Sequence, residues 1–564
     1  QRGDWRNTIT LLADDADPSQ SGDTVFATSM EVLSKRIAYR NPQYNFDKIY
    51  ADAYPQQSGA IGSYYPDVNN ALKKRLDYGT LLFNYIGHGS PQYIGTERYV
   101  EFNDISRYQN IDRLFFFVSS TCSYGRYDMP DDICGAEALI LASGGAVGTI
   151  SAGRPISHVE RFNTDICVTV LDPAYSVGDA LRYAKNRTAM SHSIQLLGDP
   201  ALHLSLPTSK VVVTAVNGKA VQEGLTDSAL VLSTVTVEGE IRGEGDELQD
   251  DFDGTLFPIV FDRATTAYTL ANDNDGTEVC FSQQKNVIYK GRAEVKSGKF
   301  TYSFTVPRDV RSEFDFAKLS HFAKSGGDCA TGAYQGLALG GFDETVDLGE
   351  TRPLLRLFMG DSNFRSGGVT GQNPHLFAIL EDSIGINAAG CGLGHDIICV
   401  LDNNGNDAVV LNDFYETDIR NPRRGYVHYG FQNLAPGPHV LVMKAWNIFN
   451  FSSEASVKFV VKGADTNQCG AFYSYPNPAA DQASLVLEFN NSGNIRDAVV
   501  EIFDQTGRPV ARFSPRANEQ SSVLGPIVWH CAAEPNGVYV ARALVTTTDG
   551  KTHGAITKIV KAKQ

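Results

Sequence analysis

The sequence predicts a multidomain protein in which an α/β domain with a parallel sheet is followed by β-sandwich domains. Its 564 residues are enough for about three to five domains. In roughly the first 200 residues, apolar strand-like runs alternate with segments of helical periodicity, the pattern of a sheet covered by helices. From Ser209 onward the helical periodicity disappears, and short alternating strands separated by turn residues follow, which is typical of antiparallel sandwiches.

The first domain, which we expect over residues 1–207, contains a strand–helix–strand unit. Leu81–Ile86 and Leu114–Val118 are apolar strands, and Glu97–Tyr108 between them is expected to be the crossover helix. Such a unit is parallel and right-handed. Pro66 marks another helix start, because its missing N–H is not needed in a first turn. The remaining predicted elements are strands at 8–13, 46–50 and 145–150, helices at about 23–39, 66–78, 133–142, 159–170 and 176–188, and a closing strand in LLGDPALHLSLP.

Each strand of this unit ends in a turn that carries a chemically reactive side chain. His88 stands between Gly87 and Gly89 after the first strand, and Cys122 follows a run of small hydroxyl residues after the second. Because parallel strands end at one edge of a sheet, we expect the imidazole and the thiol to lie on neighbouring strand tips. An imidazole beside a thiol can take its proton, and the thiolate is a nucleophile. The backbone N–H groups of Gly89 and Cys122 are candidate donors to an oxyanion.

A catalytic histidine often needs a carboxylate to orient it. Asp52 is our first candidate, because it directly follows a predicted strand, and Asp14, Asp15 and Glu97 are alternatives. Each of these could instead be a cap, a turn residue or a cation ligand.

Two arginines follow predicted strand ends near the candidate nucleophile. Arg126 could meet the substrate, or it could form a solvated loop pair with Asp128. Arg154 could recognise a substrate carbonyl or carboxylate, or it could form an ion pair beneath its loop.

The rest of the chain divides, by its pattern of strands, into further domains. We expect a β-sandwich over residues 208–350, with turns at Asn217–Gly218, Asn274–Gly276 and Ser297–Gly298. A second sandwich is expected over residues 351–463. A small β-sandwich is expected over residues 464–564, after a polar, linker-like stretch.

Composition excludes several classes of protein. The net charge of −16 disfavours a general nucleic-acid or anionic-membrane binder, and no run of 18 or more apolar residues is present. Nine cysteines without a CxxC spacing disfavour zinc and thioredoxin-like chemistry. Cys122 as a free thiol would leave eight, a number that could pair. Since Gln1 opens directly onto a predicted strand edge, we also expect that an N-terminal portion precedes it.

The motifs around these residues resemble the gingipain family of cysteine peptidases, in the clan of caspases and legumains. The matching stretches include GDWRNTITLLADDAD, NYIGHGS and FVSSTCSYGRYD. The resemblance implies a caspase/gingipain-like α/β domain with Cys122 as nucleophile and His88 as its partner. No cofactor is implied for catalysis. Bound calcium is known in such domains, so the resemblance makes the hard oxygen ligands of Asp14, Asp15 and Asp17 a candidate structural calcium site.

Within this family, the motifs most resemble those of the sortase of the type IX secretion system. That resemblance implies a cell-surface, outer-membrane-associated endopeptidase that removes the C-terminal sorting domain of cargo proteins. It also implies an immunoglobulin-like fold for residues 351–463 and a sorting-type module over 464–564. The implied partners are type IX cargo, a PorV-like outer-membrane β-barrel and anionic lipopolysaccharide as a possible acceptor of the cargo; nucleic acid is not among them.

Three other functions fit the same sequence. The chain could be a secreted gingipain-like protease that is itself type IX cargo. It could be a catalytically silent attachment scaffold, or a carbohydrate-binding adhesin built on the sandwiches.

Overall fold

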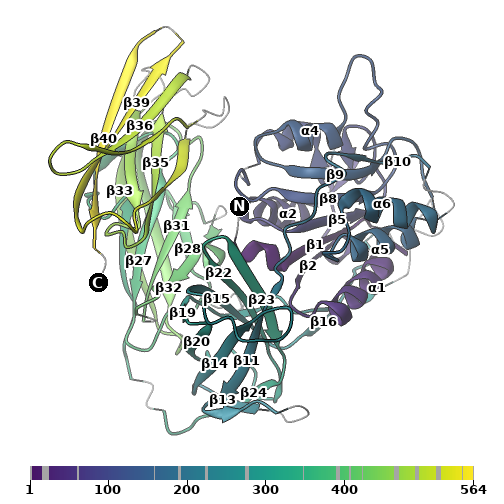
Figure 1. The fold of residues 1–564 in the computed structure, drawn as a ribbon, viewed down its shortest axis with the longest axis horizontal. Coiled ribbons are helices and arrows are strands. Elements are labelled where there is room, and N and C mark those ends of the chain that lie inside the picture. The colour runs from purple at the N-terminus through teal and green to yellow at the C-terminus, as the bar shows by residue number, and fades with distance from the viewer. Residues whose placement is uncertain are drawn as a thin grey trace. The chain divides into compact units, whose positions relative to one another are not determined.

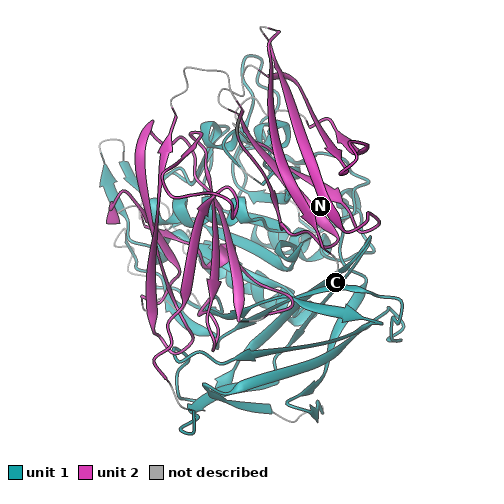
Figure 2. Cartoon of the chain, turned by 90° about the vertical axis from the view of Figure 1, so that its left-hand side faces the viewer, with its two compact units in different colours: residues 1–346 teal, residues 347–564 magenta. Residues whose placement is uncertain are grey.

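The computed structural model divides the chain into two compact units, Gln1–Val346 and Asp347–Gln564 (Figures 1 and 2). It describes residues 3–15, 25–59, 62–108, 110–157, 159–188, 192–222, 227–272, 278–346, 349–388, 394–405, 408–421, 423–462, 469–489, 495–515, 523–548 and 550–562. In these residues no helix has both the length and the apolar character needed to cross a membrane.

The first unit begins with a mixed sheet whose strands lie in the order β10-β9-β8-β5-β1-β2. All neighbouring pairs are parallel except β10, which runs antiparallel to β9. The predicted parallel sheet is therefore correct except at its closing strand. Two helices in succession separate β9 from β10; they bring the chain back to the edge where β9 ends, so β10 runs in the opposite direction. The strands are β1 (Thr8–Ala13), β2 (Asn45–Tyr50), β5 (Leu82–Ile86), β8 (Phe115–Ser120), β9 (Ala146–Ala152) and β10 (Ile194–Leu197).

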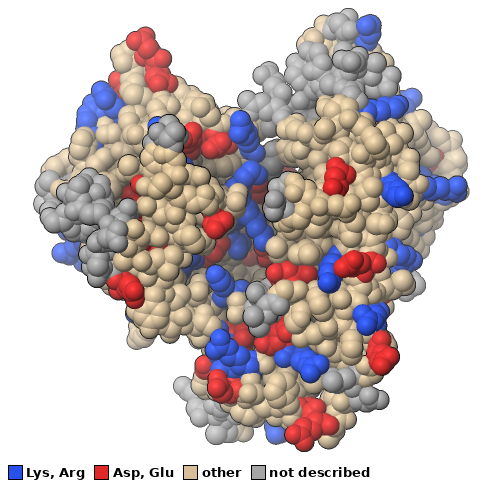
Figure 3. Space-filling view, turned by 180° about the vertical axis from the view of Figure 1, so that it is seen from behind, with Lys and Arg blue, Asp and Glu red and all other residues tan. Residues whose placement is uncertain are grey.

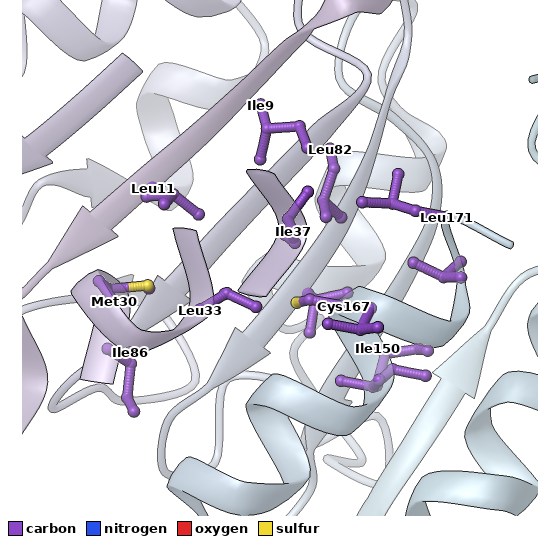
Figure 4. Packing of buried hydrophobic residues seen from close by; sticks show 14 of the residues in the cluster. Ile9, Leu11, Met30, Leu33, Ile37, Leu82, Ile86, Ile150, Cys167 and Leu171 are labelled. Carbon is purple, nitrogen blue, oxygen red and sulfur yellow. The ribbon is translucent and has the colours of Figure 1, made fainter. Parts of the chain in front are cut away.

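Helices cover both faces of this sheet, because side chains of the buried strands alternate between the faces. One face packs on α1 (Val25–Arg40), α5 (Glu160–Thr169) and α6 (Val177–Asn186). Figure 4 shows Leu33 and Ile37 of α1 and Cys167 of α5 close to the strand residues of this core. The opposite face packs on α2 (Pro66–Tyr78) and α4 (Gly135–Leu141).

The crossover between β5 and β8 differs from the predicted helix over Glu97–Tyr108. The chain forms a small hairpin, β6 (Tyr93–Ile94) with β7 (Val100–Glu101), and then a single helical turn, α3 (Phe102–Ile105). Gly95 and Arg98 have positive φ angles of 74° and 61°, which no right-handed helix contains. The parallel pairing of β5 with β8 is nevertheless as predicted.

A buried polar network ties α5 to the two central strands. The Asn84 side chain of β5 donates to the backbone oxygen of Val118 at 3.0 Å and to Asn163 Oδ1 at 2.7 Å. Asn163 of α5 returns a bond to Asn84 Oδ1 at 2.9 Å and accepts one from Ser120 Oγ at 2.9 Å. All of these side chains are buried, so each depends on the others for its hydrogen bonds.

The rest of the first unit departs from the predicted two-sheet sandwich. Its main sheet has the order β12-β11-β14-β20-β19-β15-β22-β23, and β11 also pairs with β23 at Ser209–Lys210, so the sheet closes on itself. A bulge between Val213 and Ala215 bends β11 toward closure. The predicted turns at Asn217–Gly218 and Ser297–Gly298 have the paired positive φ angles of tight hairpins, and Asn274–Gly276 lies outside the described residues.

These strands have the following bounds: β11 (Ser209–Val216), β12 (Lys219–Ala220), β14 (Thr234–Arg242), β15 (Gly254–Phe261), β18 (Val287–Lys290), β19 (Ala293–Lys296), β20 (Lys299–Thr305), β22 (Lys318–Ser325) and β23 (Asp328–Tyr334). Two smaller sheets accompany them, formed by β13 (Asp227–Val231), β24 (Leu337–Phe342) and β21 (Asp315–Phe316), and by β16 (Thr265–Tyr268) and β17 (Cys280–Gln283).

The second unit is entirely β in its longer elements. Two sheets, β25-β27-β31-β30 and β26-β33-β32-β28-β29, enclose one apolar core, and two others, β34-β35-β38 and β37-β36-β39-β40, enclose another. Two sheets around one core are the arrangement expected of each β-sandwich over residues 351–463 and 464–564, and the immunoglobulin-like and sorting-type identities stay predictions. The strands are β25 (Leu354–Met359), β26 (Gly368–Thr370), β27 (His375–Glu381), β28 (Ile398–Leu401), β29 (Val409–Val410), β30 (Tyr415–Thr417), β31 (Arg424–Gly430), β32 (Gly437–Trp446), β33 (Ser452–Val461), β34 (Cys469–Tyr475), β35 (Gln482–Phe489), β36 (Ile495–Phe503), β37 (Pro509–Phe513), β38 (Val523–His530), β39 (Gly537–Thr547) and β40 (Thr552–Lys561).

The buried network leads to a stability prediction. Asn163→Ala leaves Asn84 Oδ1 and the Ser120 hydroxyl buried without a partner and removes one of the two bonds of the Asn84 amide, so we expect a loss of about 3 kcal/mol in unfolding free energy. Thermal unfolding followed by circular dichroism measures the effect as a lower midpoint. Asn103→Ala, the same change at an exposed position, is the control. Equal shifts for the two variants would show that the network does not hold α5 on the sheet.

Candidate active site

The tips of β5 and β8 lie side by side. Ile86 pairs with Ser120, an offset of 34 positions, and the same offset relates His88 to Cys122. The ladder continues past the strand ends, because the Gly87 N–H donates to the Ser120 oxygen at 3.4 Å. Gly89 then lies directly against the second tip: a Cβ added there would overlap Thr121 Oγ1 and come within 3.4 Å of the Cys122 oxygen. The structure thus brings together the two turns that the sequence predicts to be neighbours.

The turn that carries Cys122 is held by the segment that follows β9. The half-buried Cys122 Sγ accepts a hydrogen bond from the Ile156 N–H at 3.4 Å, and the Ser123 N–H donates to the Arg154 oxygen at 3.4 Å. Ser123 has a φ of 59°, a left-handed conformation that turns the chain sharply just after the cysteine. The Cys122 thiol also donates to the Ile156 oxygen at 3.5 Å, so the backbone of Ile156 fixes the sulfur from both sides.

The backbone of His88 is fixed on both sides. Its N–H donates to Asp14 Oδ2 at 2.6 Å, and its oxygen accepts from the Tyr85 hydroxyl at 2.6 Å and from the Gly95 N–H at 2.9 Å. The half-buried imidazole meets the Phe26 ring edge-on, with centroids 5.6 Å apart. The main chain of the His88 turn is therefore positioned by Asp14, at the end of β1, and by the hairpin that follows β5.

Two backbone donors at these tips are available. Within the part of the chain that the structure describes, the N–H groups of Gly89 and Cys122 donate to no other protein group. They belong to the adjacent turns, as the sequence analysis expected for an oxyanion site. Their role in catalysis stays a prediction.

Asp52 has partners other than the one expected for it. It lies in a short 3₁₀ turn after β2, and its two oxygens accept hydrogen bonds from the Ala271 N–H at 3.0 Å and from the Asn272 N–H and side-chain amide at 2.9 and 3.0 Å. Burial raises the pKa of this carboxyl, and the backbone donors act against that rise. These contacts make Asp52 an anchor for residues 271–272, and a role in orienting His88 stays a prediction that none of them supports.

The acidic residues after β1 form a cluster with an unexpected third member. Side-chain oxygens of Asp14, Asp15 and Glu97 lie within 4.8 Å of one another. Burial, followed by the charge of Asp15, raises the pKa of Asp14 well above its usual value. Burial, followed by the charges of Asp15 and Asp14, raises the pKa of Glu97 to about 8. Asp17, predicted as a ligand beside Asp14 and Asp15, lies outside the described residues.

Sequence reasoning named Glu97 as a possible partner of His88, with a cap, a turn residue or a cation ligand as the alternative, and did not include it with Asp14, Asp15 and Asp17 in the calcium set. The signal that could have found it is Gly95, whose positive φ forms the turn that returns the chain toward β1.

Arg154 and Arg126 both form ion pairs, which the sequence analysis gave as the alternative to a role in substrate recognition. The Arg154 guanidinium makes two bonds to the Asp128 carboxylate, at 3.0 and 2.5 Å, and Arg126 Nε lies 3.9 Å from the same carboxylate. The hydrogen bond from Arg154 lowers the pKa of Asp128. All three side chains are about half exposed, and a part in substrate recognition stays a prediction.

Comparison with known proteins identifies the class. Residues 1–205 match the model of Peptidase family C25, so this part of the chain is a domain of the gingipain-like cysteine peptidase family. No curated protein matches the chain.

Solved structures of the same kind are similar to the chain. Dimeric latent PorU from Porphyromonas gingivalis is 27% identical with a TM-score of 0.32, and the match covers 69% of this chain and 38% of that one. The chain therefore spans well under half the length of that PorU. The complex of Porphyromonas gingivalis RgpB pro- and mature domains is 17% identical with a TM-score of 0.30, covering 59% of this chain and 69% of that one.

The close contact of Gly89 with Thr121 predicts that a substitution at one position can be compensated by a substitution at the other. Gly89→Ala should push the tips apart and slow alkylation of Cys122 by about tenfold or more at neutral pH, because small displacements of paired groups are costly. Thr121→Ala removes the atom that the new methyl would meet, an oxygen that is buried without a hydrogen-bond partner in the described structure. The double variant should recover the original rate.

Iodoacetamide labelling followed by peptide mapping measures the rate at Cys122 alone. Gly405→Ala, at a glycine with open space around its Cα, is the control. An unchanged rate in Gly89→Ala would mean that the two turns do not depend on each other.

Proposed function

We propose that the chain is a cysteine endopeptidase that acts as a sortase, removing the C-terminal sorting domain of type IX secretion cargo. The observation that carries the proposal is the pairing of the His88 and Cys122 turns on adjacent parallel strands of a peptidase C25 domain. The sortase role is further supported by the wording of the motifs around both residues and by the likeness of the chain to PorU over 69% of its length.

The chemistry follows from the groups at the two tips. The Cys122 thiolate attacks the scissile carbonyl carbon, and the N–H groups of Gly89 and Cys122 stabilise the oxyanion that forms. His88 protonates the amine of the departing sorting domain, leaving the cargo as a thioester on sulfur. Water then releases the cargo as an acid, or an amine on anionic lipopolysaccharide attacks the thioester and forms an amide that anchors the cargo.

The location and partners belong to the same proposal. The chain would work at the cell surface, associated with the outer membrane, beside a PorV-like β-barrel that holds the sorting domain. Nucleic acid is disfavoured by the net charge of −16, and Figure 3 shows acidic and basic side chains distributed over the same face.

A second candidate is favoured by the module over residues 464–564. Tyr475, Asn477 and the basic residues near Lys558 resemble a sorting domain, as expected if the chain were itself cargo. A cargo protease would lose residues after about Ala471 on maturation, whereas a sortase would keep them. The mass of the mature surface protein separates the two.

The proposal predicts the effect of removing the nucleophile. Cells that carry Cys122→Ala should accumulate cargo that retains its sorting domain, because the thioester cannot form. In vitro, cleavage of purified cargo should fall by at least about a thousandfold. Incubating cargo with the chain and a simple amine, then sequencing the new termini, reports cleavage and amide formation together.

Two variants complete the test. Cys280→Ala, at an exposed cysteine of β17, should cleave cargo at the original rate. His88→Ala should abolish labelling of Cys122 by a thiol-directed peptide ketone, which a silent scaffold would not show in any form. Normal cargo maturation in the Cys122→Ala cells would defeat the assignment.

A further inference from the structure

Three arginines, carried by α1, α5 and the end of α6, surround one carboxylate of the peptidase domain. These helices pack together on one face of the sheet (Figure 1). Asp165 lies in α5, and its side chain is only 6% exposed. Its Oδ2 atom accepts a hydrogen bond from Arg187 Nε at 3.0 Å and lies 3.7 Å from Arg161 Nε. Its Oδ1 atom lies 3.8 Å from Arg36 Nη1.

The cluster holds more positive charge than its carboxylate balances. Guanidinium groups stay charged in proteins, so three of them around one carboxylate leave an excess of two positive charges. In the part of the chain that the structure describes, Arg36, Arg161 and Arg187 form no ion pair other than the one with Asp165. Glu160, which precedes Arg161 in the sequence, forms no ion pair with any described residue.

The nitrogen atoms that could meet a ligand are already gathered at the surface. Arg161 and Arg187 approach the carboxylate through Nε, and their terminal Nη groups form no hydrogen bond with the described residues. The Arg187 guanidinium also lies over the Tyr183 ring, 5.2 Å from its centre. The three arginine side chains are between 41% and 63% exposed. Because Asp165 and Tyr183 hold these groups in advance, a ligand that binds them loses less entropy in ordering side chains.

We propose that Arg36, Arg161 and Arg187 bind a doubly charged phosphate group, carried by the monoester head group of a lipid or free in solution. Guanidinium groups match phosphate oxygens with paired N–H donors, and two negative charges on the ligand balance the excess of the cluster. The net charge of −16 on the whole chain does not prevent such binding. Charges further away than about 10 Å are largely screened at moderate ionic strength.

Exposed side chains beside the cluster favour a lipid as the carrier of the phosphate. Val32 and Tyr39 flank Arg36 on the same side of α1, four positions before it and three positions after it. Their exposed fractions are 56% and 91%. A tyrosine next to basic side chains suits the boundary between lipid head groups and acyl chains, where its ring is apolar and its hydroxyl is hydrated.

The cluster is separate from the candidate active site. Phe26, which meets the His88 ring, lies near the N-terminal end of α1, and Arg36 lies about 15 Å further along the helix. The inference therefore does not depend on the proposed peptidase function.

Two probes offered to the full chain test the site and separate its possible ligands. Isothermal titration calorimetry with inorganic phosphate, at constant ionic strength, measures binding of the free anion. Sedimentation with phosphatidylcholine vesicles that contain phosphatidic acid measures binding of a lipid phosphate monoester. Vesicles of equal surface charge that contain phosphatidylglycerol, a singly charged diester, are the reference. We expect phosphatidic acid to be bound about tenfold more tightly than phosphatidylglycerol, or better.

The variants compare two arginines of the same face that differ in their surroundings. Arg161→Gln should weaken binding of the phosphate probes by about tenfold or more, because it removes one charge-assisted contact. Arg182→Gln is the matched control: it removes the same charge from an arginine that is 75% exposed and paired one to one with Asp179. It should bind as the unmodified chain does. Arg36→Gln provides a second variant, and an unchanged rate of Cys122 alkylation shows that each protein is folded.

The outcomes decide between the carriers and against the proposal. Preference for phosphatidic acid assigns the site to a lipid, and binding of inorganic phosphate without that preference assigns it to a soluble phosphate. Equal losses in Arg161→Gln and Arg182→Gln would mean that net charge alone attracts the probes, which would overturn the proposal. Absence of binding of both probes to the folded, unmodified chain would overturn it as well.

Discussion

The parallel pairing of β5 with β8 is the constraint on which the candidate site depends. A single register places the residues two positions beyond each strand end opposite one another, although they are far apart in the chain. The apolar strands that make this pairing are buried on both faces, and the Asn84–Asn163–Ser120 network adds polar bonds that only one alignment satisfies. Hydrophobic burial holds the strands in the sheet, and the polar network makes the register specific.

A charged side chain from a third strand also contacts this site. Asp14 links the end of β1 to the backbone of His88, so the neighbour of β5 on its other side also contributes to the turn. The three strands β1, β5 and β8 therefore act as one platform: one carries the acidic residues, one the imidazole and one the thiol. Each side chain lies just past a carboxyl end, where a parallel sheet leaves room for polar groups.

Much of this platform can be predicted from the sequence, because its signals are local. The apolar run Thr8–Ala13 and the proline-initiated helix Pro66–Tyr78 match the observed β1 and α2 residue for residue. The neighbouring tips also follow from strand–turn patterns alone. Contacts between residues distant in sequence could not be predicted in this way: Asp52 is engaged by residues 271–272, more than 200 positions away.

Other misses had a conformational origin. The expected helix over Glu97–Tyr108 has acceptable helix formers, but a left-handed residue at Arg98 cannot be foreseen from its type. Closure of the sheet through β11 and β23 rests on only two residue pairs and a bulge, features that a strand pattern does not encode. In both cases the observed structure depends on tertiary packing, which the local sequence pattern does not report.

The hairpin insertion between β5 and β8 has an implication for how such a domain can diverge. Since the strand ladder sets the register of the two reactive tips, the part of the intervening loop beyond the Gly95 turn can lengthen, shorten or change its surface without disturbing that register. The segment that brings Glu97 beside Asp14 and Asp15 is the part of the loop that is constrained in this way. A family built on this plan could therefore remodel the rim around its nucleophile freely, provided that one acidic tether is kept or its charge is supplied from elsewhere.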